Sequence, residues 1–173
     1  MNKHIGKTVL SSDQIKDGVS HVAEQLNEKF SDGDVVILTV VPGGILFTAD
    51  LVRKLKFDVF MDYISCPHTP GDRNNSSAIV YHQNINIANR HVVLVDDAIE
   101  SGGTMKKIVE FLAQNFSVKS ISIATLFVKP GRVDIPVDQH FAYEMENDDL
   151  LVGYGLPWSD KYRNMPFVSK LIK

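Results

Sequence analysis

Apolar residues along the chain follow two distinct spacings. In three segments they recur every three or four positions, which is the spacing of a helix with one buried face. We predict helices over residues 12–30, 45–55 and 104–116. Short runs that are rich in β-branched or aromatic residues lie between and beside these segments, and such runs are typical of strands. We predict strands over residues 35–41, 58–64, 91–97 and 120–128.

Strands and helices alternate in this prediction. That order favours an α/β fold with a mainly parallel, twisted sheet flanked by helices. A chain of 173 residues with 44% hydrophobic positions is suited to one domain, residues 1–173. Residues 66–77 are dense in Pro, Gly, Asn, Asp and Ser and predict an exposed, mobile loop, followed by a hairpin-like return over residues 78–82. From Val133 onward we expect an irregular, aromatic hood beside the sheet.

Charge and cysteine content exclude several classes of partner. A net charge of −3 provides no general attraction to nucleic acid or to anionic lipid, so neither is expected as a partner. No apolar run approaches the ~18 residues that cross a membrane. The single cysteine, Cys66, cannot form an internal disulfide, which favours a reducing cytoplasm, and we interpret it as an ordinary loop residue.

Three turns follow predicted strands and contain candidate binding residues. Ligands of open parallel sheets bind at the carboxyl ends of the strands. The turns are Pro42-Gly43-Gly44, residues 96–104, and Lys129-Pro130-Gly131. Their shared position predicts a binding site at that edge of the sheet.

The second turn contains the most informative pattern. An apolar strand leads to Asp96 and Asp97, then to the small residues 101–104 and a helix. Glycines let backbone N–H groups converge on an anion, and the helix N-terminus adds about half a positive charge. Alternation along a strand should send the two aspartates to opposite sides, where they could bind sugar hydroxyls and a hydrated magnesium ion. The alternative is a plain strand–loop–helix connection with acidic helix caps.

This segment, VVLVDDAIESGGT, closely resembles the diphosphate-ribose signature of the type I phosphoribosyltransferases. A nucleotide P-loop is excluded here because the turn after this strand contains no Gly-Lys-Ser/Thr. The segments VVPGGILFTADLVRKL, LFVKPGRVDIPVD and LLVGYGLPWSDKYRNMPF resemble the bacterial hypoxanthine-guanine branch of that family, in the expected order. The resemblance therefore extends over residues 35–167.

The resemblance implies a magnesium-dependent enzyme of purine salvage. Such an enzyme transfers 5-phosphoribosyl from 5-phosphoribosyl diphosphate to N9 of hypoxanthine or guanine and releases diphosphate. Its partners would be these small molecules, and its assembly a homodimer or homotetramer. A related enzyme with another base preference, such as xanthine, and a non-catalytic nucleotide-binding regulatory protein remain alternatives.

The resemblance also implies roles for individual residues. Glu100 would act as general base or acid near N7 of the purine, Lys129 would donate to its 6-oxo group, and Leu150 with Leu151 would form an apolar wall beside it. The residues implied for 5-phosphoribosyl diphosphate are Pro42, Gly43, Gly44, Asp96, Asp97, Ser101, Gly102, Gly103, Thr104 and Arg163, with Asp96 and Asp97 also holding Mg²⁺.

The chain departs from the branch at three positions. Glu100 replaces an aspartate, Leu150 stands where many relatives have an aromatic ring, and Pro157 replaces an aspartate that helps to bind a second magnesium. Other interpretations are a helix-capping Glu100, a surface Lys129 and a surface ion pair of Arg163. The sequence leaves open whether the Pro42–Gly43 peptide bond is cis.

Overall fold

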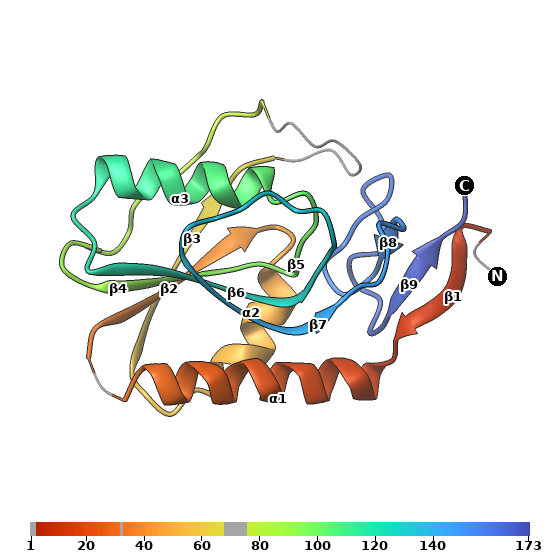
Figure 1. Cartoon of the computed structure of the whole chain (residues 1–173), viewed down its shortest axis with the longest axis horizontal. Coiled ribbons are helices and arrows are strands. Elements are labelled where there is room, and N and C mark those ends of the chain that lie inside the picture. The colour runs from red at the N-terminus through yellow and green to blue at the C-terminus, as the bar shows by residue number, and fades with distance from the viewer. Residues whose placement is uncertain (1–2, 32, 68–75) are drawn as a thin grey trace.

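The computed structural model describes residues 3–31, 33–67 and 76–173. Its centre is a six-stranded sheet in the order β3-β2-β4-β6-β5, with β7 paired to β6, and every pairing is parallel (Figure 1). The strands are β2 (Val35–Val41), β3 (Val59–Ser65), β4 (His91–Val95), β5 (Ala98–Ile99), β6 (Ser120–Val128) and β7 (Asp138–Glu144). The predicted parallel α/β fold is confirmed.

Helices cover both faces of this sheet. Helix α3 (Gly103–Asn115) lies on one face, and α1 (Ser12–Lys29) and α2 (Ile45–Val52) lie on the other (Figure 1). Strand β2 is almost wholly apolar because both of its faces are buried. Val35 and Ile37 belong to the core beneath α1, while Val36 and Leu38 belong to the core beneath α3. Helix α1 begins with a capping box between Ser11 and Gln14, which satisfies backbone N–H groups at its start.

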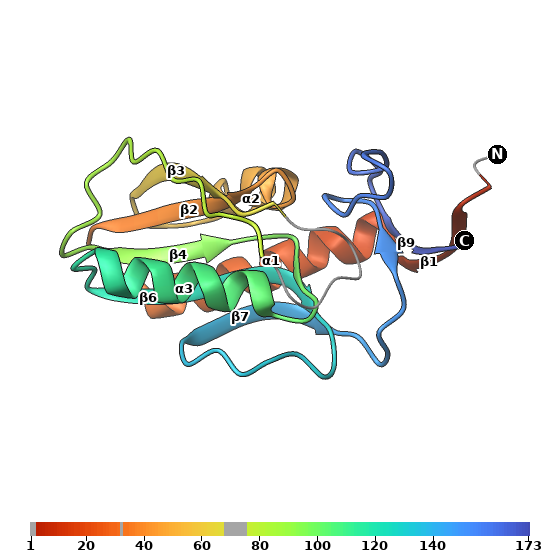
Figure 2. The same ribbon diagram turned by 90° about the horizontal axis from the view of Figure 1, so that it is seen from above.

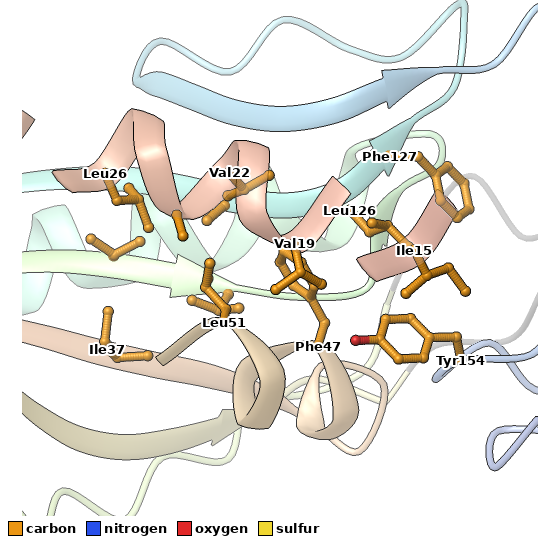
Figure 3. Packing of buried hydrophobic residues seen from close by; sticks show 14 of the residues in the cluster. Ile15, Val19, Val22, Leu26, Ile37, Phe47, Leu51, Leu126, Phe127 and Tyr154 are labelled. Atoms are coloured by element: carbon orange, nitrogen blue, oxygen red, sulfur yellow. The ribbon is translucent and has the colours of Figure 1, made fainter. Parts of the chain in front are cut away.

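A second, antiparallel sheet forms a hood at one end of the molecule. Its order is β1-β9-β8, built from β1 (Ile5–Leu10), β8 (Leu151–Val152) and β9 (Val168–Leu171), so both ends of the chain meet there (Figure 2). Tyr154 of the hood packs beside Ile15 and Phe47 (Figure 3), and its hydroxyl donates to Asp50 on α2. The hood therefore shares a core with the main sheet.

The structure differs from the prediction in two segments, near the two ends of the chain. The segment from Val133 is not uniformly irregular, because β7 adds a parallel strand beside β6. Residues 5–10, for which no element was predicted, form the edge strand β1. The hairpin-like return is confirmed as a bridge between Ser65 and Val80, whose backbone N–H groups each donate to the other's carbonyl oxygen at 2.9 and 2.8 Å.

The remaining part of the predicted loop, residues 68–75, lies outside the described residues. Cys66 is buried at the end of β3, 4% exposed, and lines the pocket described below, so it is more than an ordinary loop residue. Within the described part of the chain, no helix has the length and apolar content needed to span a membrane.

Candidate active site

A pocket lies where the carboxyl ends of the central strands meet the hood. Its wall joins segments that are far apart in the sequence: the turn after β2, the turn between β4 and α3, and the hood from β8 onward. Predicted residues that line it are Pro42, Gly43, Asp96, Asp97, Glu100, Ser101, Gly102, Thr104, Leu150, Leu151 and Arg163. Gly44, Gly103 and Lys129 do not line it, although the first two adjoin lining residues in the sequence and Lys129 contacts Glu100.

Asp96 and Asp97 face the same pocket, contrary to the prediction that they point to opposite sides. The reason is that β4 ends at Val95, so the alternation of a strand does not extend to the two aspartates. The N–H of Asp97 donates to Asp96 Oδ1, and the N–H of Ala98 donates to Asp97 Oδ1, both at 2.8 Å. Each carboxyl group thus accepts from the backbone of the next residue, and both line one pocket.

The two carboxyl groups occupy an electrostatically costly position. Asp97 is 7% exposed. Burial raises the pKa of both groups, and the neighbouring Asp97 carboxylate raises the pKa of Asp96 further. A cation or a hydrogen-bond donor from a ligand would relieve this cost, because either favours the charged form of a carboxyl group.

These two carboxyl groups fit a magnesium ion that arrives with its ligand. Among the described residues, no three His, Cys, Asp or Glu side chains gather into a metal site. A Cβ atom at Gly43 would lie 3.1 Å from Asp96 Oδ1 and from Asp97 Oδ2, so the glycine keeps the space in front of them open. Magnesium is often held by one or two carboxylates together with substrate phosphates and water. A closed cage made by protein groups alone is not required.

The small-residue turn connects the aspartates to α3. Gly102 has φ +87°, a left-handed conformation that favours glycine, and a Cβ there would also lie 3.0 Å from the Val133 side chain. Gly103 begins the helix, and its N–H faces Ser101 Oγ at 3.4 Å. Ser101, Gly102 and Thr104 line the pocket at the helix N-terminus, a position that attracts anions.

Glu100, on the pocket wall, forms an ion pair with Lys129. Strands β5 and β6 pair in register, Ile99 opposite Val128, so the next residues of each strand are neighbours. Lys129 Nζ lies 2.9 Å from Glu100 Oε1, and the lysine side chain is 1% exposed while that of Glu100 is 24% exposed. Lys129 is thus a buried cation, which excludes the surface interpretation.

The loop after β2 is held between the aspartates and the hood. Of the peptide bonds between described residues, Val41–Pro42 is cis, and Pro42–Gly43 is not. A Cβ at Gly44 would lie 2.6 Å from the carbonyl oxygen of Val95, so the loop packs directly on β4. From the hood, Gly155 approaches equally closely, because a Cβ there would lie 2.2 Å from the carbonyl oxygen of Gly43.

The hood also contributes Arg163 and an aromatic ring. Arg163 Nη1 donates to the carbonyl oxygen of Gly155 at 2.6 Å, and its charge lowers the pKa of Asp97, against the larger effect of burial. Trp158 lines the pocket beside Pro157, and it is the only tryptophan of the chain. Sequence reasoning assigned it no role, although its place in the matching tail was a usable signal.

Comparisons with known proteins show the family to which this chain is similar. The family described as phosphoribosyl transferase domain matches residues 7–155. A hypoxanthine-guanine phosphoribosyltransferase of Staphylococcus epidermidis is 28% identical over 173 residues, covering 99% of this chain and 96% of the relative.

Solved structures extend the likeness to three dimensions. A hypoxanthine-guanine phosphoribosyltransferase of Bacillus anthracis superposes with a TM-score of 0.87 at 30% identity, covering 98% of this chain and 99% of that chain. A hypoxanthine-guanine-xanthine phosphoribosyltransferase has a TM-score of 0.85 at 28% identity, with coverage of 99% and 100%. The chain belongs to the phosphoribosyl transferase family.

Proposed function

We propose that this protein is a hypoxanthine-guanine phosphoribosyltransferase of purine salvage. It would transfer the 5-phosphoribosyl group of 5-phosphoribosyl diphosphate to N9 of the base, giving IMP or GMP and diphosphate. Relatives named for this activity match the chain over nearly its whole length. The observation that carries the proposal is the Glu100–Lys129 pair beside the carboxyl and phosphate-binding turns.

The pair matches one edge of a 6-oxopurine. The ammonium of Lys129 donates, and the carboxylate of Glu100 accepts, from neighbouring positions 2.9 Å apart. A 6-oxopurine presents its O6 acceptor beside N7, where a proton can be donated. The base therefore presents this edge to both side chains, with O6 on Lys129 and N7 on Glu100. Adenine presents an amino donor at position 6 and leaves a buried cation facing a donor, which is unfavourable.

The remaining residues position the second substrate. Ser101, Gly102, Gly103 and Thr104 bind the 5-phosphate at the N-terminus of α3, with the hydroxyls and backbone N–H groups as donors. The loop Pro42-Gly43-Gly44 and Arg163 bind the diphosphate. Asp96 and Asp97 would hold Mg²⁺, which offsets the charge of the departing diphosphate when bound. Leu150 and Leu151 contribute an apolar wall to the base site.

Glu100 controls a proton during the transfer. N9 of the purine attacks C1 of the ribose as the bond to diphosphate breaks, and the proton released from N7 passes to the Glu100 carboxylate. Contacts with the two phosphate ends, remote from the reacting bond, orient the ribose. General base catalysis of this kind contributes roughly 10²–10⁴-fold to rate.

Xanthine is the second candidate base. It also has a 6-oxo group, so the Lys129–Glu100 pair does not exclude it, and a relative of 28% identity is named for xanthine as well. A non-catalytic nucleotide-binding protein is the remaining rival, motivated by Pro157 in place of an acidic residue. Against this rival, the pocket keeps Asp96, Asp97 and Glu100 together on its wall.

Product analysis tests the proposal. Purified protein with hypoxanthine, 5-phosphoribosyl diphosphate and Mg²⁺ should give IMP and diphosphate in equal amounts, and a magnesium chelator should stop the reaction. Glu100→Gln should lower kcat about 100-fold. The matched control is Glu144→Gln, because Glu144 pairs with Arg132 on the surface, 57% exposed. Release of diphosphate without nucleotide, or no turnover at all, would contradict the proposal.

A further inference from the structure

Lys129 has carboxylate neighbours on two sides. Besides Glu100 at 2.9 Å, Asp148 Oδ1 lies 3.5 Å from Lys129 Nζ. The side chain of Asp148 is 66% exposed, whereas that of Lys129 is 1% exposed. Arg132 approaches the same residue from another direction, but its Nη1 donates to the Lys129 backbone carbonyl oxygen and to Glu144, away from the ammonium.

The sheet explains this arrangement. Lys129 is the first residue after β6, and β6 has a parallel neighbour on each side near its end. On one side β5 pairs Ile99 with Val128 and leads directly to Glu100. On the other side β7 pairs Glu144 with Val128, and the chain then continues to Asp148. The two carboxylates therefore reach one ammonium from opposite edges of the same strand.

Under the function proposed above, the carboxylates of Glu100 and Asp148 have different roles. Glu100 must turn from Lys129 toward N7 of the purine to accept a proton. At that moment Lys129 would lose its nearest counter-charge while it is still buried, and an unpaired buried ammonium is costly. Asp148 does not line the pocket and has no role in proton transfer, so it can remain paired with Lys129 throughout the reaction.

We propose that Asp148 is a positioning residue for base recognition, which holds Lys129 toward O6 of the purine while Glu100 engages N7. This inference rests on the proposed function. Because Asp148 acts through Lys129 and touches no reacting atom, its loss should weaken binding of the base rather than slow the chemical step. The binding of 5-phosphoribosyl diphosphate, at the other end of the site, should not change.

The adjacent residue provides a matched control. Asp149 is also an exposed aspartate, with 38% of its side chain exposed, but it pairs with Lys170 of the hood at 2.9 Å. Asp148→Asn and Asp149→Asn therefore make the same chemical change at consecutive positions, and only the first removes a charge beside Lys129. Asp148→Glu keeps the charge and serves as the conservative variant.

The test is steady-state kinetics of the wild type and the three variants, with thermal unfolding to verify folding. Asp148→Asn should raise KM for hypoxanthine about three- to tenfold, the range of an ion pair worth roughly 1 kcal/mol, with kcat and KM for 5-phosphoribosyl diphosphate within about twofold. Asp148→Glu should recover most of the loss, and Asp149→Asn should behave as wild type.

Two results would overturn the inference while leaving the proposed function intact. One is an Asp148→Asn variant with the same KM for hypoxanthine as Asp149→Asn. The other is a loss confined to kcat, which would place Asp148 in the chemical step. A wild-type protein that makes no nucleotide would instead refute the proposed function, and the inference with it.

Discussion

Replacing Lys129 with methionine tests whether its ammonium recognises the 6-oxo group of the base. The change removes the ammonium and keeps an unbranched apolar stem in a site that is 1% exposed. A charge-assisted hydrogen bond at such a buried site contributes about 1.5–3 kcal/mol to binding. We therefore expect kcat/KM for hypoxanthine and guanine to fall about 10- to 150-fold, since every 1.4 kcal/mol corresponds to about tenfold.

The folded state should tolerate this change. Breaking a buried ion pair is most costly when it strands a buried charge. Here the carboxylates left behind are partly exposed, 24% for Glu100 and 66% for Asp148, so water can reach them. We expect a stability loss on the order of 1 kcal/mol, which chemical denaturation would measure.

The assay is initial-rate kinetics with hypoxanthine, guanine and adenine at saturating 5-phosphoribosyl diphosphate. The matched control is Lys170→Met, because Lys170 pairs with Asp149 at the same 2.9 Å distance but with 51% of its side chain exposed. The control should stay within about twofold of wild type. Discrimination against adenine should weaken only in Lys129→Met. If Lys129→Met keeps wild-type kcat/KM for both 6-oxopurines, the assignment of Lys129 to O6 is wrong.

Three further predictions follow from the hood and the core. Gly155→Ala should lower the free energy of unfolding in urea by more than about 2 kcal/mol, because the new Cβ would lie 2.2 Å from a carbonyl oxygen. The control is Gly33→Ala, which has nearly the same φ but open space around the Cβ and should lower it less. IMP should change the fluorescence of Trp158, the only tryptophan, and Trp158→Phe should abolish the signal but not turnover. Burial lowers the pKa of His91 and His140. Their contribution to stability is therefore present above about pH 6.5 and lost as pH falls through their folded-state pKa values. The Tm of the wild type should drop toward acid pH. The Tm of a His91→Asn/His140→Gln variant should drop less.

The sequence predicted the central strands well because they are covered on both faces. Strands β2 and β6 match their predicted bounds. Strand β2 is a nearly continuous apolar run, and β6 is buried from Ser122 to Val128. Strand β7 was missed because it pairs only with β6 and its side chains are mostly partly exposed, so no apolar run marks it. Strand β1 is likewise an edge strand, in the hood, and depends on β9 for its partner.

The candidate site was predictable where it depends on local sequence. The turn around Ser101 and the two aspartates could be read from consecutive residues, except for their direction, which depends on β4 ending at Val95. Contacts across the sheet could not be read in this way. The second partner of Lys129 depends on β7 lying beside β6, and Asp148 therefore became visible only in three dimensions.

The most direct test of the account is a base panel on the purified wild-type protein. Hypoxanthine, guanine, xanthine and adenine would each be supplied with 5-phosphoribosyl diphosphate and Mg²⁺, and nucleotide formation followed by chromatography. The account predicts IMP and GMP but no AMP, because the buried ammonium of Lys129 requires an acceptor at position 6 of the base. Equal turnover of adenine, or binding of 5-phosphoribosyl diphosphate with no nucleotide from any base, would contradict it.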